Sequence, residues 1–225
     1  CSLLPITYPR VPEPLQKELR SIFASLCVDE IPTVRRAACF EFASMAACLS
    51  DELVLLELAG PFARLSKDDQ DSVRLLSVDA CIAMLPAFAR SGATHRILPA
   101  IFALCTDKSW RVRYMIADRF PVMLSAIGAD LLAGDDLPEF FQKLLTDHEN
   151  EIRTAAAAQL YPTCEILGAE RTLRCLMRAV KQLAQDPCQH TRAALGKEIM
   201  FLALVLPPAD FLTHILPLFL TMLKD

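Results

Sequence analysis

Hydrophobic positions recur along this chain with a helical spacing, and the whole pattern returns at a nearly constant interval. Five stretches, "DEIPTVR", "DDQDSVR", "DKSWRVR", "DHENEIR" and "DPCQHTR", each begin with an aspartate and end with an arginine six residues later. Successive arginines lie 39, 39, 40 and 39 residues apart. A fixed period of this length indicates a repeat architecture. The five pairs are Asp29 and Arg35, Asp68 and Arg74, Asp107 and Arg113, Asp147 and Arg153, and Asp186 and Arg192.

A first helix is predicted upstream of each aspartate. Apolar residues stand ten, six and three positions before it, as Leu58, Phe62 and Leu65 stand before Asp68. These offsets, i, i+4 and i+7, mark one face of an α-helix. Prolines near the starts of these segments are compatible with a helix, because the first turn has N–H groups without partners anyway.

A second helix is predicted from the end of each turn onwards. Its apolar face is shown by Val112, Ile116 and Phe120, which follow one another at four-residue steps. The pattern runs out about fifteen residues past each arginine, where helix-ending residues such as Gly128 and Gly168 stand. Each repeat is therefore predicted to be two antiparallel helices joined by a tight turn at the aspartate.

The repeats are expected to stack into one all-α solenoid. A single hairpin cannot bury its own apolar faces, but neighbouring hairpins side by side form a continuous core. The first residue is Cys1 and not Met, so we expect the chain to be a piece of a longer protein. One domain over 1–225 is predicted, with repeats at 13–50, 51–90, 91–128, 129–168 and 169–208 and a partial repeat at 209–225.

Composition supports helices and gives no sign of nucleic acid or membrane as a partner. Hydrophobic residues make up 53% of the chain, whereas there are only six glycines. The net charge of −4 provides no basic surface for nucleic acid or anionic lipid. The apolar run "MFLALVLPP" is too short to span a bilayer, and no signal peptide is visible at the start.

The nine cysteines form no C-x-x-C motif and no set with the spacing of a metal site. We interpret them as small buried hydrophobes in a reducing compartment, and we expect the protein in the cytoplasm, with the nucleus as a second location. Seven of them fall in apolar helical stretches: Cys27, Cys39, Cys48, Cys81, Cys105, Cys164 and Cys175. Neither a metal nor a cofactor is expected.

No catalytic constellation is visible in the sequence. It contains no phosphate-binding glycine loop, no G-x-S-x-G and no H-E-x-x-H. The four histidines are scattered among turns and helix starts, and no two share a helix at i, i+4. We therefore expect that the chain is not an enzyme.

The repeated aspartate and arginine are better explained by structure than by a single site, because the pair recurs in five consecutive repeats. We predict a structural ladder. Each carboxylate accepts hydrogen bonds in its own turn, and each guanidinium forks to carboxylates or carbonyls of its own and the next repeat. Thr191 replaces the valine before the arginine in the last full repeat, which weakens the motif there.

The turn "KSWRV" contains the only tryptophan of the chain, Trp110. Tryptophan and arginine are the residues most often found as anchors of protein interfaces. Two interpretations stay open: Trp110 contacts a partner, or it packs against the next turn, since large aromatic side chains are commonly buried. Because Val112 takes the position that faces the core, we favour the contact.

Several of these stretches also resemble a known family. "DEIPTVRRAA", "DDQDSVRLLSVDAC" and "DKSWRVRYMIADRF" are similar to HEAT repeats of the scaffold (A, or structural) subunits of protein phosphatase 2A, and "LPLFLTMLKD" at 216–225 fits the same family. The resemblance is weaker in the first dozen residues and in 161–210. It implies a non-catalytic superhelix of HEAT repeats, and this chain looks like its middle segment.

The resemblance also implies partners. In that family the turns within the repeats hold interchangeable regulatory B subunits, and the phosphatase catalytic subunit is bound mainly by repeats beyond this segment. "HENEI" and "PCQHT" depart from the family's sequence, so no contacts are carried over there. The alternative is another HEAT scaffold or a nuclear transport carrier, which shares the fold but does not predict "DKSWRVRYM". The family's contact positions fall on Pro32, Arg36, Ser109, Trp110 and Arg111, with Asp69 and Gln70 as weaker candidates.

Overall fold

The regular secondary structure of the described residues is entirely helical. The computed structural model describes residues 1–128, 132 and 134–224, and no strand occurs among them. These helices form successive hairpins, and neighbouring hairpins pack through their helix faces. The predicted all-α solenoid class is therefore confirmed.

The residues divide into two compact units. Unit 1 comprises 1–104 together with 126–128, and unit 2 comprises 105–125 together with 129–225. Unit 1 contains α1 (Leu3–Thr7), η1 (Tyr8–Arg10), α2 (Glu13–Leu26), α3 (Pro32–Phe40), α4 (Phe42–Ala47), α5 (Asp51–Leu53), η2 (Val54–Leu58), α6 (Ala59–Leu65), α7 (Asp71–Arg90), η3 (Thr94–Arg96) and nearly all of α8 (Leu98–Cys105).

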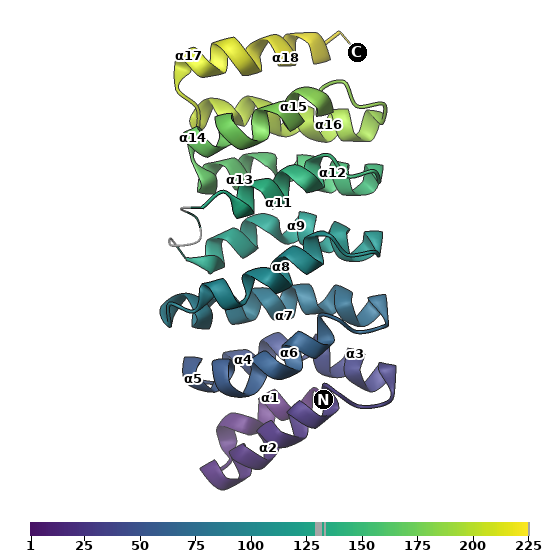
Figure 1. Cartoon of the computed structure of the whole chain (residues 1–225), viewed down its shortest axis with the longest axis vertical. Coiled ribbons are helices and arrows are strands. Elements are labelled where there is room, and N and C mark those ends of the chain that lie inside the picture. The colour runs from purple at the N-terminus through teal and green to yellow at the C-terminus, as the bar shows by residue number, and fades with distance from the viewer. Residues whose placement is uncertain (129–131, 133, 225) are drawn as a thin grey trace. The chain divides into compact units, whose positions relative to one another are not determined.

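Unit 2 contains most of the second half of the chain. In Figure 1, α12 runs beside α16, so the second helices of consecutive hairpins lie next to each other within this unit. Its elements are most of α9 (Trp110–Ile127), α11 (Asp136–Leu145), α12 (Asn150–Ala158), α13 (Leu160–Leu167), α14 (Ala169–Arg171), η4 (Thr172–Leu176), α15 (Met177–Leu183), α16 (Gln189–Glu198), η5 (Ile199–Leu204), α17 (Pro208–Asp210), η6 (Phe211–Ile215) and α18 (Leu216–Met222).

The first helix of three hairpins contains a π-helical turn that the apolar spacing did not predict. These turns are η2, η4 and η6, and each joins a short α-helical turn to a longer α-helix. In η2 both Val54 and Leu58 are buried. The π turn thus keeps apolar contacts in place where the helix departs from ideal α geometry.

The second helices differ in continuity. The helices α7 and α9 are unbroken, whereas α3 and α4 are separated at Glu41, where ψ is 1°. A similar break at Gln159, where ψ is 14°, separates α12 from α13. Helix α16 passes directly into the 3-10 helix η5. The sequence predicts a single second helix in each repeat, so these interruptions correct that expectation.

The helix ends after α9 and α13 are formed by glycine. Gly128 has a φ of +85° and Gly168 a φ of +82°, a region that residues with a Cβ rarely adopt. Gly168 follows Leu167 directly, and its backbone N–H bonds to the carbonyl of Cys164, which completes the last turn of α13. Glycine therefore ends these second helices without steric cost.

Aromatic side chains fill the core of each unit. In unit 1 the ring of Phe42 lies 5.8 Å from that of Phe23 and 6.2 Å from that of Phe62. In unit 2 the rings of Phe120 and Phe141 are 4.8 Å apart. All five side chains are buried. Each such pair contributes roughly 0.5–1.5 kcal/mol beyond the burial of its apolar area.

The cysteines are less uniformly buried than expected. Cys27, Cys39, Cys81, Cys105 and Cys164 are buried, but Cys48 and Cys175 are partly exposed, which corrects the prediction for these two. Cys48 directly follows α4 and Cys175 lies in η4, and the residues around both include core and surface positions. A thiol is small enough to be accepted at either place.

Among the described residues, one helix, α7, is long and apolar enough to cross a membrane by length and composition alone. However, 56% of the most apolar stretch of α7 is buried inside the structure. The core helix of a globular domain has the same properties, so this feature is weak evidence for a membrane span.

Candidate functional site

The five turns between the helices of the hairpins share one hydrogen bond. In each turn the aspartate Oδ1 accepts the backbone N–H of the residue two positions later, at 2.8 to 3.0 Å. This bond closes the turn and directs the chain into the second helix. The donors are the N–H groups of Ile31, Gln70, Ser109, Glu149 and Cys188.

The arginine of each pair returns to its own turn. Nη1 of Arg113 donates to the carbonyl oxygen of Asp107 at 2.7 Å, and the other four arginines make the same bond to their own aspartates at 2.7 to 2.8 Å. Each guanidinium therefore holds the start of the second helix against the turn that precedes it.

Arg35, Arg113 and Arg153 also reach the next hairpin. Each forms a two-pronged contact with the next aspartate of the series, with Nε at 2.5 to 2.7 Å from Oδ2 and Nη2 at 3.0 Å from Oδ1. Both side chains of each pair are mostly buried. The structure thus brings together Arg35 with Asp68, Arg113 with Asp147, and Arg153 with Asp186.

These contacts determine the charge state of the aspartates. Burial alone would raise the pKa of Asp147, but Arg113 and the N–H of Glu149 outweigh it, so the pKa lies below its ordinary value. The pKa values of Asp68 and Asp186 are lowered for the same reasons. The carboxylates therefore stay ionised at neutral pH and keep their arginines in place.

In unit 1, the residues that resemble the family's contact positions lie on exposed turns. Pro32 is exposed at the first position of α3, and Asp69 and Gln70 are exposed just before α7. Arg36 lies one helical turn after Pro32 and lines a cavity of about 310 Å³ beside Phe40, whose side chain is 69% exposed.

In unit 2, the candidate contacts gather at the start of α9. Trp110 is 43% exposed, while Val112 is fully buried, so the two side chains point to different surroundings. The guanidinium carbon of Arg111 lies 5.7 Å from the centre of the indole ring, within range of a cation–π attraction. Ser109 is half-buried directly before the helix.

Tyr114 is an exposed aromatic residue that the sequence interpretation missed. It lies four residues after Trp110 on the same helix and is 40% exposed. Residues at i and i+4 share a helix face. Tyr114 could have been identified from its position four residues after Trp110, which places it on the same helix face as the tryptophan and not on the face of the buried Val112.

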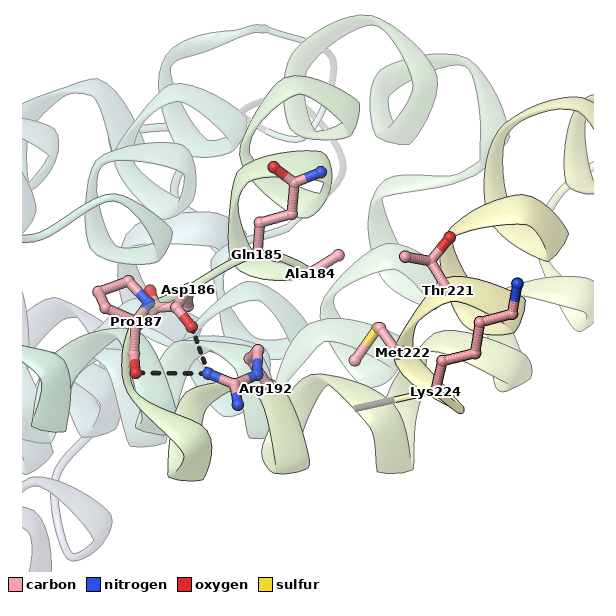
Figure 2. Close-up of a pocket in the computed structure, with 8 residues that line it drawn as sticks. All are labelled: Ala184, Gln185, Asp186, Pro187, Arg192, Thr221, Met222 and Lys224. Carbon is pink, nitrogen blue, oxygen red and sulfur yellow. Dashed lines mark hydrogen bonds between the residues drawn. The ribbon is translucent and has the colours of Figure 1, made fainter.

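A groove lies between neighbouring turns in both units. In unit 2 it measures about 480 Å³ and lies between the turn at Asp186 and the C-terminal end of α18, near Lys224. Figure 2 shows Arg192 in this groove, with hydrogen bonds to Asp186 and Pro187. In unit 1 the groove of about 420 Å³ is lined by the corresponding residues, including Asp29, Arg35 and Lys67.

These surfaces present charged and aromatic groups. In the part of the chain that the structure describes, no group of three or more His, Cys, Asp or Glu side chains is arranged to hold a metal ion. Exposed aromatic and charged side chains on the turns are suited to binding another protein.

Two stretches of the chain match families of helical repeats. Residues 131–208 match the family described as PPP2R1A-like HEAT repeat. Residues 97–127 match the HEAT repeat family. Together the two matches cover turns and helices of both units.

The curated relatives include regulatory A subunits of protein phosphatase 2A. The beta isoform of the human 65 kDa regulatory A subunit of serine/threonine-protein phosphatase 2A is 38% identical over 229 residues, which is 100% of this chain and 38% of the relative. The regulatory A subunit of protein phosphatase PP2A from Schizosaccharomyces pombe is 37% identical over 115 residues, 51% of this chain and 20% of the relative. The chain thus spans well under half the length of these relatives.

A solved structure has a similar fold. The crystal structure of an engineered protein superimposes with a TM-score of 0.53, covers 82% of this chain and 79% of its own, and is 13% identical. At this identity the similarity concerns the fold alone.

Proposed function

Because the chain belongs to the HEAT-repeat family of protein phosphatase 2A regulatory (A) subunits, we propose that it is part of a non-catalytic scaffold that binds phosphatase subunits. Its turns bind a regulatory B subunit. The catalytic subunit is positioned mainly by repeats outside this segment. The scaffold acts in the cytoplasm and also in the nucleus.

The observation that carries this proposal is the placement of Trp110. A large aromatic side chain exposed at a turn, with Arg111 beside it and Val112 in the core, presents contact area to a partner instead of to its own helix. Aromatic and arginine side chains dominate the binding energy of protein interfaces. The hydrogen bonds of the Asp107 turn hold this surface in a fixed geometry, so little order has to be gained on binding.

The turns of unit 1 extend the proposed contact. Pro32 and Arg36 present an apolar and a cationic group from α3, and Asp69 and Gln70 present polar groups from the next turn. Charges of both signs on neighbouring turns favour partners with the complementary pattern, which provides specificity and a faster association.

The full-length protein, purified and mixed with recombinant regulatory B and catalytic subunits of protein phosphatase 2A, tests the proposal. We expect a stable three-component complex in size-exclusion chromatography, and no phosphatase activity from the scaffold by itself. The alternative, a nuclear transport carrier, predicts binding to a small GTPase in the same assay. Binding to the GTPase and not to the phosphatase subunits would overturn the proposal.

A further inference from the structure

A second exposed surface lies in unit 2, away from the turns. It consists of Tyr161 and Glu165 on α13 and of Phe201 and Leu204 on η5, and we call it the Tyr161–Phe201 patch. Phe201 is 51% exposed and Leu204 is 73% exposed, although both are large apolar side chains. None of these residues belongs to the positions proposed to contact phosphatase subunits.

The 3-10 geometry of η5 accounts for the apolar half of the patch. Side chains at i and i+3 eclipse each other in a 3-10 helix. Ile199 and Leu202 therefore share the side that faces the core, and both are fully buried. Phe201 and Leu204 share another side, and both are exposed there. An α-helix would not place the two residues so directly above one another.

Hydrogen bonds and ring contacts hold the polar half in place. The ring of Tyr161 lies 5.4 Å from that of Phe201, tilted by 40°. Its hydroxyl donates to Oε1 of Glu165 at 2.8 Å, which fixes an exposed carboxylate beside the aromatic pair. Glu198 accepts the backbone N–H of Tyr161 near the start of α13, and burial raises the pKa of this glutamate.

The charges around the patch favour a cation. The faces of aromatic rings are negative, and Glu165 adds an exposed carboxylate next to them. Lys197 on α16 lies four residues before Phe201 in the sequence and is exposed.

We propose that the Tyr161–Phe201 patch binds an arginine side chain on the surface of a partner protein. The flat guanidinium stacks on the exposed ring of Phe201 and forks to the carboxylate of Glu165. Its aliphatic stem packs against Leu204. Lysine fits less well, because its compact ammonium neither stacks nor forks.

The test uses full-length protein with 4-fluorophenylalanine at position 201 and three short synthetic peptides. The peptides differ only in a central arginine, lysine or citrulline, the last of which keeps the shape of arginine without its charge. We expect a saturable ¹⁹F shift with the arginine peptide, and binding at least about tenfold weaker with citrulline. No saturable shift, or equal binding of the arginine and citrulline peptides, would refute the proposal.

Variants of the same labelled protein separate the contributions. Glu165→Gln should weaken binding of the arginine peptide by about tenfold, and Lys197→Gln should strengthen it. Glu170→Gln, which changes an exposed carboxylate outside the patch, is the matched control and should bind as the unmodified protein does. Unchanged binding by Glu165→Gln would overturn the proposal. The results for these variants do not test the proposed binding of phosphatase subunits, because that binding depends on other residues.

Discussion

Arg113 joins two hairpins through one side chain: its Nη1 bonds to the carbonyl of Asp107 in its own turn, and its Nε and Nη2 clasp the carboxylate of Asp147 in the next. The side chains of Arg113 and Asp147 are 8% and 9% exposed. A contact of this kind has a structural role, because each end of the guanidinium is already occupied by the chain itself.

Replacing Arg113 with alanine should destabilise the protein strongly. Removing one partner of a buried pair leaves an uncompensated charge, here that of Asp147, and costs about 3–5 kcal/mol. The free energy of unfolding, measured by urea denaturation with circular dichroism, should fall by that amount. Arg90→Ala is the control, because Arg90 pairs with Asp51 in an exposed position, where solvent screens the charges, and its loss should cost much less stability. Equal losses in the two variants would contradict the ladder role.

Acid should weaken the protein in a defined window. The pKa of Asp147 is lower in the folded than in the unfolded chain, so the unfolded chain takes up a proton first as the pH falls. The stabilisation is therefore complete above the unfolded pKa of about 3.9 and is lost as the pH falls through the lower folded pKa. Asp68 and Asp186 act in the same direction.

Urea midpoints recorded at a series of pH values measure this loss. They should be level in mildly acidic buffer and should fall below about pH 4. The urea midpoint should fall less steeply in Asp147→Asn, because this variant has no carboxyl group that can be protonated at position 147. A midpoint that rose on acidification would show that the folded carboxylates bind protons more tightly than the unfolded ones.

Trp110→Ala should weaken binding of a regulatory B subunit by about 2 kcal/mol and leave the helical signal unchanged, since the side chain is substantially exposed. Isothermal titration calorimetry on the full-length protein gives the affinity. Ile116→Ala on the same helix is the matched control: it empties a fully buried position and should cost about 2–5 kcal/mol of stability. Loss of helical signal in the tryptophan variant would instead mark Trp110 as part of the core.

Cys188 should be alkylated faster than Cys81. The Cys188 sulfur accepts backbone N–H groups at the start of α16, that of Thr191 above all, which lowers the pKa of the thiol. Burial raises the pKa of Cys81 to about 12. A short iodoacetamide pulse followed by peptide mass spectrometry should label Cys188 and spare Cys81. The same pulse in urea, where both thiols are exposed, should label Cys188 and Cys81 equally. Equal labelling of the two thiols in the folded protein would contradict the predicted difference in reactivity.

Repetition in the sequence predicted the hairpins because the same apolar offsets occur before every aspartate. Apolar spacing cannot report the break at Gln159 or the π turn at Val54–Leu58, since a 3-10 or a π turn each differs from an α turn by less than about one residue. Those departures depend on how each helix fits its neighbour, which is a property of the packed unit.

The candidate contacts were visible from the sequence only in part. Trp110 was identified because it is a large aromatic residue in a turn, and Tyr114 was missed because it lies inside a helix. Phe201 looked like one more apolar residue of a hydrophobic run. Its exposure follows from the 3-10 path of η5, which the run itself does not encode.

The ion pairs that Arg35, Arg113 and Arg153 form with the next hairpin have the same geometry, and this has a consequence for how such a chain can change length. Arg35, Arg113 and Arg153 each grip an aspartate 33 or 34 residues ahead with the same pair of nitrogens, so the joints are interchangeable. Excision or duplication of one whole period would restore a matching joint at the seam. Loss of half a period would leave an arginine and an aspartate without their partners. Evolutionary insertions and deletions are therefore restricted to complete repeats.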